Sequence, residues 1–236
     1  DLRDSKQVSE WTTASFVVHS GKDNDFTLVY TGDVCGQGWG IDESRGGYRI
    51  FSAMKKLEPD LFVHLGDTIY ADNPLEREVK LDDGTVWKNL TTEEKSKVAE
   101  TLNEFRGNHR YNNLDQNLRD FNSSVSQIVL WDDHEVRNNW FPSQIRADKR
   151  YAENADDLLA ARALAAFLEY YPVRVPNISR PKIYRSSRFG PLLEVFAWDM
   201  RRYRGPNNDN RQKEMAPDSS ILGRTQLAWI QSSLNQ

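Results

Sequence analysis

The sequence predicts an α/β fold with its functional groups at the carboxyl edge of a parallel sheet. Residues 61–65 form an apolar run that leads into Gly66 and Asp67, the pattern of a buried parallel strand ending in a sharp turn. A second apolar run lies at residues 26–31, and helically spaced apolar residues at 48–57 separate the two runs. Strand, helix and strand make a β-α-β unit, and open sheets of such units place their reactive crevice at the strand ends.

The remaining elements follow from periodicity and from turn residues. Thr92 and the two glutamates after it predict the start of a helix, and residues 150–170 carry one amphipathic stripe. In chain order we expect a strand at 11–19, a linker at 21–25, a strand at 26–31, helices at 48–57, 92–105 and about 110–121, a strand at 127–131, a helix at 150–170, a hairpin-like entry to a further core strand at 188–198, and a helix at 222–234.

Composition narrows the function. The chain has 236 residues and a net charge of -4, so nothing in it indicates the basic face of a nucleic-acid-binding protein. No stretch reaches the roughly 18 apolar residues of a transmembrane helix. Cys35 is the single cysteine, which excludes an internal disulfide. We therefore expect one large globular domain, or one domain and part of another, with no membrane span.

Four predicted strands end in polar groups, and this repetition indicates an active site. The pairs of polar residues after the strands are Asp33 and Cys35, Asp67 and Tyr70, Asp133 and His134, and Asp199 and Arg201. Carboxyl ends of parallel strands meet at one edge of a sheet, so these side chains are expected to converge. Asp199 and Arg201 are expected to form an ion pair that orders the site rather than to take part in the reaction.

Metal binding explains several of these residues. Asp67 and Tyr70 form an oxygen pair suited to a hard ion such as Fe³⁺, although Asp67 could instead cap the next helix while Tyr70 fills the core. In a glycine-rich loop Cys35 is expected to face the crevice, where a cation would deprotonate it. The alternatives are that Cys35 is a small buried hydrophobe and that Asp33 is the ligand.

Two histidines are candidates for roles beside the metal. Asp133 could flank a pair of cations together with Asp67, and His134 is placed to protonate a leaving alkoxide. The alternative for these two residues is an acidic helix N-cap. His109 is expected in a loop, where it either faces solvent or reaches the substrate. His64 lies within a strand and is expected in the core.

Six motifs together give the chain a resemblance to a known family: VCGQGWGID (34–42), PDLFVHLGDTIYAD (59–72), RYNNLDQNLRDF (110–121), QIVLWDDHEVRNNW (127–140), YRSSRFGPLLEVFAWDMRRYR (184–204) and LGRTQLAWI (222–230). The sequence resembles the PhoD-type alkaline phosphatases and phosphodiesterases, which include the Streptomyces-type metal-dependent phospholipases D, within the calcineurin-like metallophosphatases. The resemblance implies a four-layer α/β/β/α sandwich. Residues 1–25 would be the end of a preceding β-sandwich module or linker, and residues 26–236 the N-terminal part of the catalytic domain.

The resemblance also implies roles for the site residues. Cys35, Asp67 and Tyr70 would hold Fe³⁺, Asp67 would also face Ca²⁺, and Asp133 would be a further metal ligand. His134 would be the catalytic residue. Asn138 and Asn139 would line the substrate site, as His109 would if its loop reached that far.

The activity implied by the resemblance is metal-dependent hydrolysis of phosphate esters, in a secreted or periplasmic protein. The substrate would be a small phosphate ester or, in the phospholipase D alternative, a phospholipid. A module that keeps the fold but only binds a partner or an ion is the alternative of another class. The family needs further His and Asp ligands after the helix at 222–234. We therefore expect a C-terminal segment of the same protein, possibly a second chain, to complete the site.

Overall fold

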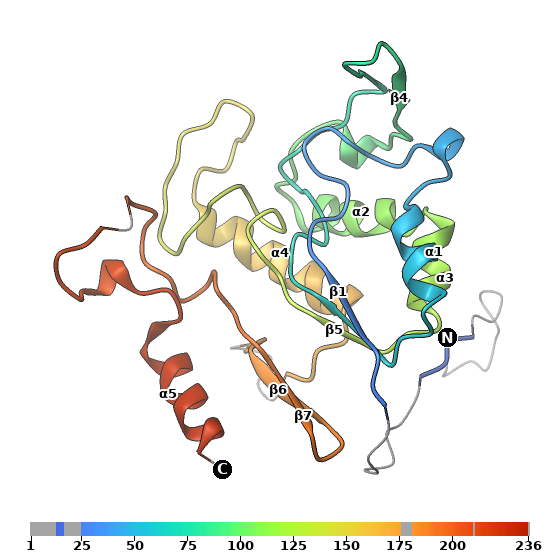
Figure 1. The fold of residues 1–236 in the computed structure, drawn as a ribbon. Helices are drawn as coiled ribbons and strands as arrows, with labels where there is room; N and C mark the ends of the chain where they lie inside the picture. Colours follow the sequence, from blue (N-terminus) through green and yellow to red (C-terminus); the bar gives the residue numbers. More distant parts are fainter. Residues whose placement is uncertain (1–12, 17–24, 176–180, 210, 236) are drawn as a thin grey trace, which may run out of the picture.

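The computed structural model describes residues 13–16, 25–175, 181–209 and 211–235, and its centre is a three-stranded parallel sheet (Figure 1). Strands β1 (Leu28–Thr31), β2 (Leu61–His64) and β5 (Gln127–Val129) lie in the order β1-β2-β5. These strands fall within the three apolar runs, so the predicted α/β class and the three predicted strands are confirmed. The parallel pairing brings the loops after all three strands to the same edge of the sheet.

One face of the sheet is covered by helices α1 (Arg49–Lys55) and α3 (Gln116–Asn122). Phe62 of β2 contacts both helices, with ring centroids 6.3 Å from Phe51 and 5.0 Å from Phe121. All three rings are at most 1% exposed. Burial of each such side chain stabilises the fold by about 1.5–3 kcal/mol, so this cluster fixes the β-α-β unit.

Helices α2 (Leu102–Asn112) and α4 (Asp156–Tyr170) build the largest core cluster around the end of β5. Phe105 of α2 and Leu159 and Phe167 of α4 are fully buried there, together with Trp131 just beyond the strand. This cluster packs against the loop after β5, which carries Asp133 and His134.

The opposite face of the sheet packs against an antiparallel hairpin of β6 (Arg185–Phe189) and β7 (Leu193–Ala197). Ala197 lies in one core cluster with Leu61, Val63 and Ile128 of the parallel strands. On the outer side of the hairpin, Trp229 of α5 (Gly223–Leu234) contacts Phe196, with ring centroids 5.9 Å apart.

The structure confirms the hairpin predicted at 188–198, but it corrects the expectation that the strand after the turn joins the core sheet. The turn at Gly190, whose φ is 63°, lets β7 pair with β6. The backbone groups of β7 are therefore satisfied locally, and the hairpin packs on the sheet through side chains.

The helix predicted at 92–105 is also corrected. Residues Glu93–Lys95 form only a 3₁₀ turn (η2), and α2 begins at Leu102. Thr101 and Glu104 make a capping box there, which stabilises a helix start more than Thr92, whose side chain makes no capping bond. Similarly, the helix expected from residue 150 begins at Asp156, because Ala155 forms a bridge with Ile145.

The remaining elements are peripheral. They are a β3–β4 hairpin (Glu78–Lys80 and Val86–Lys88) and two 3₁₀ turns, η1 (Glu43–Arg45) and η3 (Pro217–Ser219). Of the strand expected at 11–19, residues 11, 12 and 17–19 lie outside the described residues, and residues 13–16 form no strand. Within the described ranges, none of the helices has the length and apolar character required to cross a membrane.

Candidate metal centre

The loops after β2 and β5 approach each other at Gly66. This glycine has a φ of 117°, and a Cβ atom placed on it would lie 2.6 Å from the Cβ of Asp132 and 2.7 Å from its backbone nitrogen. Only glycine permits both the backbone conformation and this contact. Asp67 follows with a φ of 53°, which turns its side chain toward the loop after β5.

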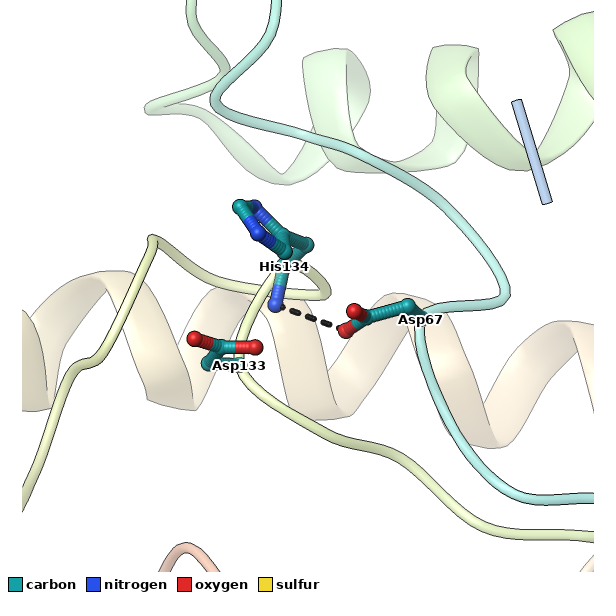
Figure 2. A group of neighbouring side chains, drawn as sticks. All are labelled: Asp67, Asp133 and His134. Carbon is teal, nitrogen blue, oxygen red and sulfur yellow. Dashed lines mark hydrogen bonds between the residues drawn. The ribbon is translucent and has the colours of Figure 1, made fainter. Parts of the chain in front are cut away.

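Asp67, Asp133 and His134 form a cluster that could hold a metal ion, and their ligand atoms all lie within 4.8 Å of one another. Figure 2 shows the carboxylates of Asp67 and Asp133 on facing loops, with His134 above them. The backbone N–H of His134 donates to Asp67 over 3.1 Å, and that of Asn139 donates to Asp133 over 2.5 Å. The structure therefore brings together these three of the predicted site residues.

The electrostatics of the cluster fit a cation. Burial, the negative charges of Glu135 and Asp133, and a side-chain hydrogen bond with Asp33 raise the pKa of Asp67 to about 8. A positive ion between the carboxylates would remove this repulsion and return Asp67 to its charged form. Carboxylate oxygens, a phenol and an imidazole are also a donor set that hard cations bind. The residues present thus fit a metal centre.

Glu135 ties the two loops together, and the sequence analysis did not single it out. Its buried carboxylate accepts hydrogen bonds from the backbone N–H groups of Asp67 (3.2 Å), Thr68 (2.5 Å) and Asp132 (2.7 Å). Burial raises the pKa of Glu135 to about 7, although these hydrogen bonds oppose the shift. The sequence signal for Glu135 was the acidic run at residues 132–135. Within this run Asp132 and Glu135 support the loops, and Asp133 is the carboxylate that joins the cluster.

Asp72 orients His134, and it too was missed. The Nδ1 atom of His134 lies 2.6 Å from an Asp72 oxygen, and the ring stacks on Tyr70 with centroids 4.2 Å apart. Burial alone would lower the pKa of His134, but the negative charges of Asp72, Asp133 and Asp67 raise it. Because Nδ1 faces Asp72, Nε2 is the nitrogen left to exchange a proton with another group.

Tyr70 links the cluster to Asp33. The phenol donates a 2.6 Å hydrogen bond to Asp33, and burial together with this bond raises the pKa of Tyr70. Gly36 packs on the ring so closely that a Cβ on it would lie 2.4 Å from Cζ of Tyr70. Asp33 also contributes to the raised pKa of Asp67 by a side-chain hydrogen bond. Asp33 therefore joins the cluster through both residues.

The structure does not bring Cys35 to this cluster. Its half-buried side chain packs among apolar residues with Tyr48, and burial raises the pKa of the thiol. The expected exposure of the thiol to the crevice is therefore not observed. Asp33, Cys35 and Gln37 all have φ values between 57° and 63°, and these left-handed conformations interrupt the side-chain alternation on which the expectation depended.

Of the other predicted site residues, two lie beside the cluster and one is buried away from it. Asn138 and Asn139 are exposed beside the cluster, and the N–H of Asn138 donates to Asp72 over 2.9 Å. His109 does not lie in a loop, because α2 extends through it. Its buried ring stacks on Tyr170, with centroids 4.8 Å apart. His64 is buried in β2, as expected.

Arg201 supports the site differently from the prediction. Its Nε donates to Asp132, and its Nη2 lies 3.7 Å from an oxygen of Asp133. Asp199 instead accepts hydrogen bonds from the backbone N–H of Arg201 and from the indole of Trp131, both over 3.1 Å. Arg201 is therefore paired with the acidic loop after β5, and Asp199 fixes the turn that carries it.

The fold and this cluster define an α/β protein with a candidate metal centre at the carboxyl edge of a parallel sheet. A family model described as PhoD-like phosphatase matches residues 28–236. The chain belongs to the PhoD-like phosphatase family.

Two relatives agree with this assignment. Over 198 residues the chain is 31% identical to alkaline phosphatase D of Bacillus subtilis (strain 168), a match that covers 80% of this chain and 32% of that protein. The solved structure of PhoD is similar with a TM-score of 0.68 and 27% sequence identity, over 94% of this chain and 40% of that one. The chain thus spans well under half the length of these relatives.

Proposed function

We propose that this chain carries the catalytic edge of a phosphoric ester hydrolase that works with bound metal ions. The observation that carries the proposal is the cluster of Asp67, Asp133 and His134, within 4.8 Å, with His134 oriented by Asp72. The alkaline phosphatase activity in the relative's name supports the same reaction class.

Asp67 and Asp133 would hold the metal ions, with Tyr70 and either Asp33 or Cys35 completing the ligands from this chain. The phenol and carboxylates would suit Fe³⁺, and the resemblance to the family adds Ca²⁺, so we propose these two ions. Such ions would polarise the phosphoryl oxygens and lower the pKa of a water molecule at the site. The contacts of Asp33 with Tyr70 and Asp67 favour Asp33 over Cys35.

His134 would act as the general acid. Asp72 accepts from Nδ1 and so keeps a proton there, which leaves Nε2 to deliver a second proton to the departing alkoxide. The carboxylate of Asp72 favours the protonated ring that this step needs. The exposed side chains of Asn138 and Asn139 are placed to bind substrate oxygens. We give His109 no role, because its ring is buried against Tyr170.

The finer assignments follow the family. We propose a phosphomonoester or phosphodiester as the substrate, with phospholipid hydrolysis as the second candidate, and a secreted or periplasmic location. We further propose that the helices, the parallel sheet, the β6–β7 hairpin and α5 belong to a four-layer sandwich. The packing of the hairpin on the sheet, and of Trp229 on Phe196, supports this arrangement.

The test is a comparison of His134→Ala with the unchanged protein. We expect turnover of p-nitrophenyl phosphate or bis(p-nitrophenyl) phosphate to fall by about 10²–10⁴-fold, as for loss of a general acid, while the metal content stays the same. Chelation should abolish activity, and replacement of the metal should restore it. Asp82→Asn, in the exposed turn of the β3–β4 hairpin, is the control.

Two outcomes would contradict the proposal. Loss of metal together with activity in His134→Ala would make His134 a ligand instead of the acid. Absence of hydrolysis of monoester, diester and phosphatidylcholine vesicles by the metal-loaded protein, with the expected C-terminal segment present, would favour the binding module.

A further inference from the structure

Lys95 is a buried lysine that contacts the backbone of the candidate site at Tyr70. It lies at the end of η2 and is 3% exposed. Its Nζ donates to the backbone carbonyl of Tyr70 over 2.8 Å and to the side-chain oxygen of Asn108 over 3.0 Å. Asn108 is itself fixed, because its amide nitrogen donates to the carbonyl of Glu104 over 3.0 Å. The ammonium group thus joins helix α2 to the peptide that follows Tyr70.

The segment that Lys95 holds carries two groups of the site. Tyr70 directs its phenol to Asp33 and stacks on His134, and Asp72 contacts Nδ1 of His134. The same segment is also bonded through its backbone, since Ala71 donates to the carbonyl of His134 over 2.9 Å. A shift of the Tyr70 carbonyl would therefore move the phenol and the Asp72 carboxylate together.

Stability alone does not account for a lysine at this position. Both acceptors of its Nζ are neutral, and within the described part of the chain no carboxylate forms an ion pair with it. Burying a charge without an ionic partner is costly, and such costs are found where position or charge serves function.

We propose that Lys95 is a positioning residue of the candidate hydrolase site: by holding the carbonyl of Tyr70 it sets Asp72 against Nδ1 of His134. The expected effect on turnover rests on the proposed function. The contact between Asp72 and His134 can be tested without it. Lys95 would thus support the site from η2, away from the ends of the parallel strands.

The kinetic test uses Lys95→Met, whose unbranched side chain matches lysine as far as Cε but has no donor. Loss of positioning at a general acid harms a poor leaving group more than a good one, because only the poor one needs the proton. We expect turnover of an alkyl phosphate to fall by about 10- to 100-fold, the usual effect of removing such a supporting partner, and that of p-nitrophenyl phosphate to fall markedly less. Equal losses with both esters, or no loss, would overturn the proposal.

Lys97→Met is the matched control. Lys97 lies two residues away, and its ammonium pairs with Glu104 at 2.5 Å while its side chain is 56% exposed. The same substitution there should change turnover of neither ester. If Lys95→Met does not fold, as judged by circular dichroism, Lys95→Gln takes its place, because its shorter amide does not reach the Tyr70 carbonyl. For that variant, too, turnover of the alkyl phosphate should fall more than turnover of p-nitrophenyl phosphate.

A crystal structure of the variant separates this inference from the proposed function. In the unchanged protein the His134 Nδ1 to Asp72 distance is 2.6 Å. We expect this pair to separate beyond hydrogen-bonding distance when Lys95 is replaced. If the unchanged protein hydrolyses no ester, the proposed function fails, yet the structure still tests the inference. An unchanged Asp72–His134 contact in the variant would overturn it.

Discussion

At the scale of single residues, the candidate site is a group of neighbouring carboxylates. Asp33, Asp67 and Asp133 converge from three loops, and buried Glu135 lies behind them. Burial, together with the negative charges of Glu135 and Asp133, raises the pKa of Asp67 to about 8. Arg201 offsets part of this charge, but its Nε donates to Asp132, outside the cluster. These residues therefore fit a cation, as the proposed function requires.

The choice between Asp33 and Cys35 as a ligand leads to a direct prediction. We expect Asp33→Asn to lower metal affinity by about 10- to 100-fold, because Asp33 contacts Tyr70 and Asp67, whereas Cys35→Ser should leave metal content unchanged. Elemental analysis of both purified variants, with the unchanged protein alongside, measures the outcome. Loss of iron from Cys35→Ser with full iron in Asp33→Asn would show the reverse assignment.

The sequence could not make this choice, and the reason is conformational. It located both residues in the loop after the first core strand, which the structure confirms. Left-handed φ values at residues 33, 35 and 37 then decide which side chain faces Tyr70, and such values for non-glycine residues leave no periodic signal. Asp67 and Asp133 were predictable because each directly ends a buried apolar run.

At the scale of elements, the glycine-rich loop after β1 is shaped by the ring of Tyr70. Gly36→Ala would place a Cβ 2.4 Å from the ring, so Tyr70 must move away from Asp33. We expect this variant to lose both activity and metal affinity while keeping its helical circular dichroism. Gly32→Ala is the control, because there a Cβ would find its nearest atoms at 3.8 Å. Equal behaviour of the two alanine variants would contradict the prediction.

Element boundaries and sheet membership show where sequence patterns are insufficient. The three parallel strands were predictable, because each is a short apolar run bounded by turn residues. The hairpin of β6 and β7 was indicated by its turn residues, but its separation from the parallel sheet was not, since sheet membership depends on contacts far apart in sequence. The start of α2 at Leu102 depended on a cap at Thr101 that competed with an apparent start at Thr92.

At the scale of the whole molecule, buried histidines make stability dependent on acid pH. His109 lies between α2 and α4, and burial lowers its pKa from 6.5 to about 3. Below pH 6.5 the unfolded chain binds a proton at this residue that the folded chain does not, so stability falls as the pH falls toward 3. The loss per residue is about 1.4 kcal/mol per pH unit in this window.

Replacement of the His109 imidazole should make the stability of the protein less dependent on pH. His109→Phe keeps a ring to stack on Tyr170 and removes the titrating group, so its free energy of unfolding should fall less between pH 6.5 and 4 than that of the unchanged protein. Urea titrations of the two proteins at both pH values measure the difference. Parallel losses in the two proteins would show that His109 is not responsible.

The parallel pairing of β2 with β5 also has a kinetic consequence. The chain between these strands includes the β3–β4 hairpin, α2 and α3, so a long loop must close before Val63 can pair with Ile128. Asp67 and Asp133 come together only when that pairing exists, because they follow these two strands. Contacts between such distant segments form slowly. During refolding the appearance of cation affinity should therefore lag behind the appearance of helix, and a metal-sensitive dye would time the final step of assembly.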